Sequence, residues 1–70
     1  MKTLAFQRTD DGELFVLDPT TGDYCMEAME REFPGSRRMH WSESTLANTT
    51  GFKPIYDEAL LTDLLKEKYK

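Results

Sequence analysis

Apolar and polar residues alternate near the start of the chain, and this pattern predicts a β-hairpin over residues 3–18. Residues 3–7 have the two-residue period of a strand. The apolar run 14–17 follows Asp11-Gly12, a dipeptide that favours the positive φ angles of a tight hairpin turn. The loop is either this dipeptide alone or the four residues 9–12. In both registers one face of the hairpin carries the same large apolar side chains: Leu4, Phe6, Phe15 and Leu17.

An amphipathic pattern follows and predicts a helix over residues 24–32. The preceding sequence at residues 18–22, DPTTG, is typical of a turn. Asp23 is placed to cap the helix through its side-chain oxygen, and Pro34-Gly35 would end it. The apolar face of this helix consists of Cys25, Ala28, Met29 and Phe33, while the outer side carries Glu27, Glu30 and Arg31.

Residues 37–42 alternate in bulk and predict a third strand. In this strand Met39 and Trp41 would face the core, whereas Arg38 and His40 would face solvent. We expect Trp41 to be buried, because a domain this small needs its only tryptophan for packing.

The last part of the chain predicts an amphipathic helix over residues 54–70. Acidic residues lie in its first turn and lysines in its last, which is the arrangement that the helix dipole favours. Before it, residues 42–48 could form one helical turn and residues 49–51 a loop. The apolar stripe of the final helix consists of Tyr56, Leu60, Leu61, Leu64, Leu65 and Tyr69.

Together these elements predict an α+β domain with the order ββαβα. Its sheet would be small and mainly antiparallel, with about three strands formed by the N-terminal hairpin and one further strand. Two helices would cover one face of this sheet. A chain of 70 residues forms one domain, residues 1–70, since it buries only about 60% of the surface that its unfolded form would expose.

Cysteine content and hydropathy predict the cellular location. Cys25 is the only cysteine, which excludes an intramolecular disulfide and favours a reducing compartment. Gln7 and Arg8 interrupt the N-terminal segment too early for a signal peptide. The longest apolar run has four residues, so no transmembrane segment is predicted. We therefore expect a cytoplasmic protein that does not bind membranes.

The net charge of −4 is unevenly distributed along the chain. Residues 1–35 contain three basic and eight acidic residues, whereas residues 36–70 contain six basic and five acidic residues. The acidic first half disfavours nucleic-acid binding by long-range attraction, although a local basic patch can still act.

The sequence shows no residue set typical of catalysis, metal binding or a cofactor. A nucleophile needs a base within hydrogen-bond reach, and Cys25 and His40 are the only cysteine and histidine. We interpret Cys25 as a small hydrophobic residue; the alternative is a Cys25–His40 pair with a reactive thiol. Zinc would need about four ligands, the acidic hairpin tip lacks EF-hand spacing, and no glycine-rich nucleotide loop is present. We expect no enzyme activity, no metal and no cofactor.

Two surfaces are candidates for partner binding. The first is a basic and aromatic patch: Arg37, Arg38, His40 and Trp41. Tryptophan and arginine are frequent at binding hot spots. The second is an acidic face that could dock on a basic region of a partner: Asp23, Glu27 and Glu30.

The predicted function is that of a small intracellular accessory or regulatory protein, of the inhibitor or adaptor type used by phages and mobile elements. It would bind another protein. The alternative is a nucleic-acid-binding module, in which phosphates meet the arginines of the patch and bases stack on Trp41, with Lys53 extending the patch. The final helix either completes this domain's own core or is shared with a second copy, so the chain would be a monomer or a homodimer.

Overall fold

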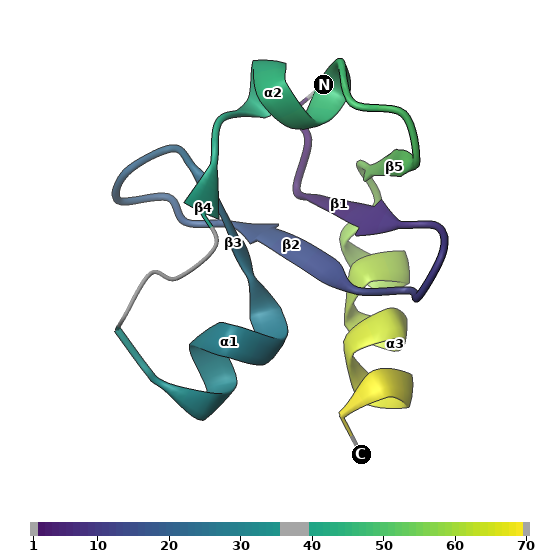
Figure 1. Cartoon of the computed structure of the whole chain (residues 1–70). Coiled ribbons are helices and arrows are strands. Elements are labelled where there is room, and N and C mark those ends of the chain that lie inside the picture. The colour runs from purple at the N-terminus through teal and green to yellow at the C-terminus, as the bar shows by residue number, and fades with distance from the viewer. Residues whose placement is uncertain (1, 36–39, 70) are drawn as a thin grey trace.

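The computed structural model describes residues 2–35 and 40–69, which form five strands and three helices (Figure 1). Along the chain they are β1 (Ala5–Arg8), β2 (Leu14–Leu17), β3 (Tyr24–Met26), α1 (Glu27–Glu32), β4 (His40–Trp41), α2 (Glu43–Ala47), β5 (Phe52–Ile55) and α3 (Glu58–Lys68). The predicted α+β class is confirmed. The order βββαβαβα corrects the predicted order ββαβα, because the sequence pattern does not reveal β3 and β5, and α2 is a third helix.

The predicted N-terminal hairpin is confirmed, and it has the longer of the two expected loops. Phe6 of β1 lies opposite Phe15 of β2. The Arg8 amide donates a hydrogen bond to the Glu13 carbonyl oxygen at 2.8 Å, which leaves residues 9–12 as the loop. The last loop residue, a glycine, has a φ of 76°, a conformation that other residues adopt only with strain.

Residues 24–26 form strand β3 and not the start of the predicted helix. The preceding turn closes a second hairpin, in which the Gly22 amide donates to the Asp18 carbonyl oxygen at 2.8 Å. Pairing with β2 satisfies the backbone groups of β3, and this outweighs the helical spacing of its side chains. Asp23 therefore does not cap α1, whose N-cap is Met26 without a side-chain hydrogen bond.

Strand β5 forms one edge of the sheet, and β4 forms the other (Figure 1). The strand order is β4-β3-β2-β1-β5, with all neighbours antiparallel. Pro54, expected to start a helix, lies in β5 opposite Phe6. The Thr9 amide donates a hydrogen bond to the Gly51 carbonyl oxygen. In an antiparallel pair of strands, hydrogen-bonded and non-hydrogen-bonded residue pairs alternate, so Pro54 lies at a non-hydrogen-bonded position. An edge strand tolerates proline at such a position because no ladder bond is lost.

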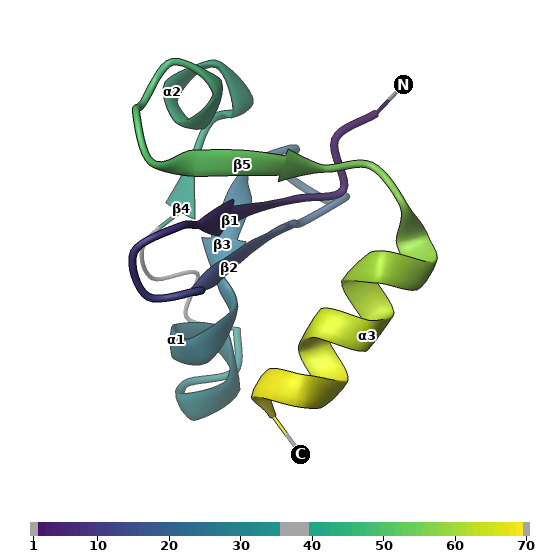
Figure 2. The same cartoon turned by 90° about the vertical axis from the view of Figure 1, so that its right-hand side faces the viewer.

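Helices cover both faces of the sheet, and the prediction of one covered face is wrong. Helix α2 lies on one face, whereas α1 and α3 lie on the other (Figure 2). The buried cluster under α2 contains Phe6, Phe15, Tyr24 and Leu46. The cluster against α3 contains Ala5, Leu14, Ile55 and Leu61. The second face of the first hairpin is therefore as buried as the face that the sequence predicts, since Ala5 and Leu14 are both 0% exposed.

Helix α3 begins later than predicted, because residues 52–55 belong to β5. Asp57 is its N-cap and accepts a hydrogen bond from the Ala59 amide at 2.9 Å. The residues of the predicted stripe that pack against the sheet include Leu61, Leu64 and Leu65. Tyr56 precedes the helix, and Leu60 is 47% exposed. No helix in the described part of the chain, α3 included, has both the length and the apolar character that crossing a bilayer requires.

The end of α3 is attached to α1 and to the first hairpin. The Arg31 guanidinium lies over the Tyr69 ring, 4.1 Å from its centroid, a cation–π contact. Lys68 Nζ lies 3.3 Å from the Glu13 carboxylate. Burial, and then the negative charge of Glu13, raise the pKa of Tyr69. These contacts fix the orientation of α3 on the sheet.

Candidate functional site

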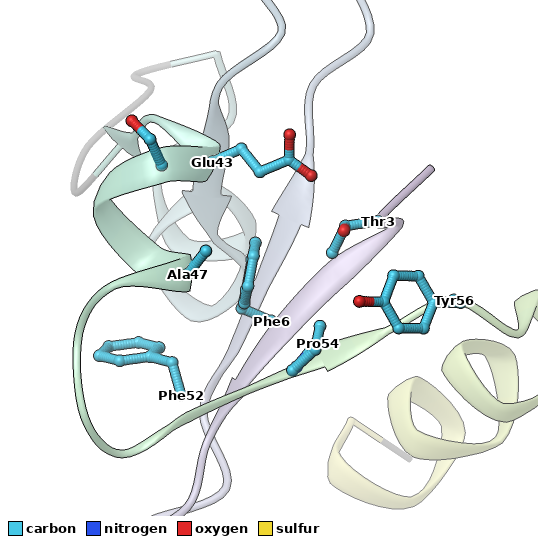
Figure 3. Close-up of a pocket in the computed structure, with 8 residues that line it drawn as sticks. Thr3, Phe6, Glu43, Ala47, Phe52, Pro54 and Tyr56 are labelled. Carbon is cyan, nitrogen blue, oxygen red and sulfur yellow. The ribbon is translucent and has the colours of Figure 1, made fainter. Parts of the chain in front are cut away.

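An open groove lies between α2 and the end of the sheet where β1 pairs with the edge strand β5 (Figure 3). Its cavity volume is about 550 Å³, within the range of about 300–1,000 Å³ that is usual for ligand pockets. Its lining consists of Thr3, Phe6, Glu43, Ser44, Ala47, Phe52, Pro54 and Tyr56. We call this feature the α2–β5 groove.

Buried aromatic residues fix the floor of the α2–β5 groove. Phe6 is 1% exposed and meets Tyr24 edge to face, with ring centroids 5.1 Å apart. Phe52 makes the same type of contact with Phe15 at 5.3 Å. Leu46 of α2 belongs to the same buried cluster. Because packing holds these side chains, the groove is formed before any ligand arrives.

Side-chain hydrogen bonds hold the short helix α2, which forms one wall of the groove. Ser42 is the N-cap, and its Oγ accepts a hydrogen bond from the Thr45 amide at 3.3 Å. At the other end, Asn48 Nδ2 donates to the Ser44 carbonyl oxygen at 2.7 Å. Glu43 lies in the first turn, where the helix dipole stabilises a carboxylate.

Polar groups gather at the end of the groove nearest Thr3. The Tyr24 hydroxyl donates a hydrogen bond to the Thr3 carbonyl oxygen at 2.7 Å. Burial raises the pKa of Tyr24, and the nearby negative charge of Glu43 raises it further. In Figure 3 the Glu43 side chain extends toward Thr3, and the Tyr56 hydroxyl points toward the groove. The groove is therefore apolar on its floor and negative at one end.

The predicted basic and aromatic patch lies partly outside the described residues, because Arg37 and Arg38 fall there. His40 and Trp41 form strand β4. Trp41 is 40% exposed, so the prediction that it lies in the core is wrong. The physical reason is that β4 is a two-residue edge strand, where a side chain has fewer neighbours than in the middle of a sheet.

Trp41 lies on the same face of the sheet as the α2–β5 groove. It is opposite Tyr24 in the antiparallel pair of β3 and β4, and directly opposite residues place their side chains on one face. Tyr24 in turn is hydrogen-bonded to Thr3, which lines the groove. An exposed tryptophan therefore lies on the face that holds the groove, two residues before Glu43 in the chain.

The predicted acidic face is used in part within the molecule. Glu27 Oε2 accepts a hydrogen bond from Arg31 Nε at 3.0 Å, and Glu30 Oε1 accepts one from the Gly35 amide at 2.8 Å. Glu27 and Glu30 also line a second pocket of about 250 Å³, whereas Asp23 does not. The Arg31 guanidinium compensates the charge of Glu27, which reduces the charge that this face can offer to a partner.

Cys25 and His40 lie opposite each other on β3 and β4. Such pairs have Cβ atoms about 4.5–5.5 Å apart, so strand pairing brings together the two residues of the alternative catalytic pair. Cys25 is 7% exposed, and the carboxylates that share its pocket are Asp18, Glu27 and Glu30. The burial of Cys25 in a pocket that carboxylates line favours a structural role for this thiol.

The acidic tip of the first hairpin is organised by a cation from the chain itself. Asp11 accepts hydrogen bonds from Arg8 Nε at 3.1 Å and from Arg8 Nη2 at 2.7 Å, and Asp10 lies 3.4 Å from the same guanidinium. Over residues 2–35 and 40–69, no group of three or more His, Cys, Asp or Glu side chains is arranged to hold a metal ion.

The sequence does not predict the α2–β5 groove, because three of its lining residues come from β5 and the position directly after it. A weak signal for this strand exists in residues 52–56, FKPIY, where positions 52, 54 and 56 are apolar and share one strand face, although Ile55 on the other face is apolar too. The groove-lining positions in this segment are Phe52, Pro54 and Tyr56. Proline obscures the two-residue period, since it is usually taken to break a strand.

Comparison of the chain with known protein families, with curated proteins and with solved structures finds no match. Inference about function therefore rests on the geometry of the surfaces described above.

Proposed function

We propose that the protein is a small, non-catalytic accessory or regulatory protein that binds another protein through the α2–β5 groove and the adjoining Trp41. One observation carries this proposal: a preformed groove with an apolar floor has aromatic side chains left open to solvent at its side. Tyr56 is 45% exposed and Trp41 is 40% exposed.

Exposed aromatic residues next to an apolar groove are typical of protein-binding surfaces. Tyrosine and tryptophan offer a large contact area and lose little side-chain entropy on binding. Burying them gains about 25 cal/mol for each Å² of apolar surface. The molecule exposes 4630 Å², so an interface of about 800 Å² per partner would cover roughly a sixth of it and could include both the groove and Trp41.

Ala47→Arg is the variant that tests this surface. Ala47 is exposed and lines the groove, so a long side chain at this position would fill the groove without disturbing the core. Arginine favours helix, and its position four residues after Glu43 permits an ion pair. The matched control, Ala59→Arg, makes the same change at an exposed position of α3 outside the groove.

Affinity capture from the native host would be carried out with the wild-type protein and both variants. We expect the wild type and Ala59→Arg to retain the same stoichiometric protein partner and Ala47→Arg to lose it. If no partner is captured, or if Ala47→Arg retains it unchanged, the proposal is wrong.

A nucleic-acid-binding module is the second candidate, and the exposure of Trp41 is the observation that favours it. Because the chain has one tryptophan, intrinsic fluorescence reports base stacking on this residue alone. Stacking of a single-stranded oligonucleotide would quench the fluorescence at low salt, and added salt would reverse the effect. The net charge of −4 and the carboxylate in the groove oppose such binding, so we expect no quenching.

A further inference from the structure

Glu43 places a negative charge at the rim of a groove whose floor is apolar. Among the described residues, none forms an ion pair or a hydrogen bond with its carboxylate. The charge is close enough to Tyr24 to act on its buried hydroxyl. Attraction between charges is stronger beside apolar surface than in open water, so this exposed carboxylate is a point of recognition for a cation.

Other carboxylates of the molecule already have cationic partners within it. These pairs are Asp11 with Arg8 at 2.7 Å, Glu27 with Arg31 at 3.0 Å and Glu13 with Lys68 at 3.3 Å. Their charges are compensated in the free protein, and a ligand cation would have to compete with the internal one. Glu43 differs from them because its carboxylate is open and adjoins a cavity.

The walls of the groove suit a flat cation with an apolar stem. Tyr56 is 45% exposed and its hydroxyl points toward the groove in Figure 3, while Pro54 and Phe52 extend the apolar surface. A guanidinium is planar and weakly hydrated, so it can stack on an aromatic ring while it donates two hydrogen bonds to a carboxylate. An ammonium group is more strongly hydrated and has no flat surface to stack.

We propose that the α2–β5 groove binds an arginine side chain of the partner protein, with its guanidinium on Glu43 and its methylene groups along Pro54 and Phe52. This inference rests on the proposed function and defines the partner's chemistry as a basic segment with a protruding arginine. The net charge of −4 attracts such a segment. A neutral side chain in the groove would leave the Glu43 carboxylate desolvated and unpaired, which provides selectivity.

The test is a titration of the full chain, labelled with ¹⁵N, with three blocked tripeptides followed by NMR. The probes are Ac-Gly-Arg-Gly-NH₂, the same peptide with neutral citrulline, and the same peptide with lysine. We expect the arginine peptide to shift the amide signals of Phe6, Glu43 and Ala47, and the citrulline peptide to bind about tenfold more weakly because the charge-assisted hydrogen bonds are lost.

Two variants of the protein separate a specific site from general attraction to an acidic surface. Glu43→Gln removes the charge and keeps the shape of the side chain, and we expect it to lower the affinity for the arginine peptide about tenfold. Its matched control, Glu67→Gln, makes the same change in net charge at an exposed position of α3 and should leave binding unchanged. Ala47→Arg should abolish peptide binding, since the introduced arginine would itself pair with the Glu43 carboxylate.

The proposal is overturned if the arginine peptide shifts no groove signal, if Glu43→Gln binds it as tightly as the wild type, or if the lysine peptide binds equally well. These outcomes are distinguishable from failure of the proposed function. Suppose that the wild type captures a partner, that Ala47→Arg loses it and that Glu43→Gln retains it fully. This outcome supports protein binding through the groove and refutes the proposal that the groove binds an arginine. If the arginine peptide binds the groove but no partner protein is captured, the arginine site is supported and the proposed protein-binding function is wrong.

Discussion

Asp11 shows how one residue organises a turn through several contacts at once. Its carboxylate accepts two hydrogen bonds from Arg8 and a third from the Glu13 amide at 3.0 Å. The Arg8 guanidinium is the main reason that the pKa of Asp11 lies well below its usual range, and the Glu13 amide adds to the effect. The side chain that the sequence places in a solvated acidic tip is therefore ionised and paired.

Asp11→Asn tests this pair, because it removes the charge but keeps an oxygen for the Glu13 amide. A carboxylate with a lowered folded-state pKa contributes stability above its unfolded pKa of about 4, and this stability is lost as the pH falls through the folded value. We expect the variant to melt below the wild type at pH 7 and the difference to narrow as the pH falls below about 4. Melting is followed by circular dichroism across this range.

Asp10→Asn is the control, since Asp10 is 3.4 Å from Arg8 and its side chain is 78% exposed. It should have a smaller effect at pH 7. A constant difference between Asp11→Asn and the wild type at every pH would contradict the role of the charge.

The two hairpins are closed by the same kind of loop, although the sequence reveals only the first. In each, a glycine with positive φ ends a four-residue loop and its amide donates to the carbonyl oxygen four residues earlier, from Gly12 to Arg8 and from Gly22 to Asp18. The second loop resembles a helix start because Asp23 follows it. The two loops share the same spacing of turn residue and glycine, but the helical side-chain pattern of residues 25–33 favoured a helix, so local sequence did not reveal β3.

Gly22→Ala tests the loop at the level of this element. The φ of Gly22 is 81°, and a Cβ built there has nothing within 4 Å, so the cost is conformational and not steric. We expect a loss of about 1 kcal/mol in the free energy of unfolding, measured by urea denaturation. Gly22→Asn should lose less, because asparagine tolerates the left-handed region. Equal stability of all three proteins would contradict this explanation.

The whole molecule is a single sheet with a separate buried cluster on each face. Neighbouring residues of β2 belong to different clusters: Leu14 packs in the cluster against α3, and Phe15 packs in the cluster under α2. The chain is too short for two independent cores, and the shared sheet allows both clusters to form from 70 residues. The groove arises because α2, with five residues, leaves part of its face of the sheet uncovered.

The use of the apolar stripe of α3 leads to a prediction about the oligomeric state. Leu61, Leu64 and Leu65 pack against this chain's own sheet, which leaves Leu60 as the outward leucine of the helix. One exposed leucine is a small apolar area for a dimer interface, so we expect sedimentation as a monomer. Leu60→Lys should then change neither the sedimentation coefficient nor the stability. If the wild type sediments as a dimer and Leu60→Lys as a monomer, the helix is shared between two copies and the prediction is wrong.

Local pattern by itself determined the α+β class, the first hairpin, the helical turn after Ser42 and the amphipathic final helix. These features depend on contacts between residues close in sequence, which turn chemistry and periodicity encode directly. Of the predicted shared face, Phe6, Phe15 and Leu17 do lie together, whereas Leu4 packs against the cluster on the α3 side. Only the tertiary structure decided that residues 24–26 pair with β2, that Pro54 fits an edge strand and that Trp41 stays exposed. Each of these three features depends on which strand a segment pairs with. The neighbouring strand satisfies backbone hydrogen bonds and buries side chains even where the local sequence favours another conformation. The α2–β5 groove exists only through such pairing, since it joins residues near the N-terminus to residues 43–56.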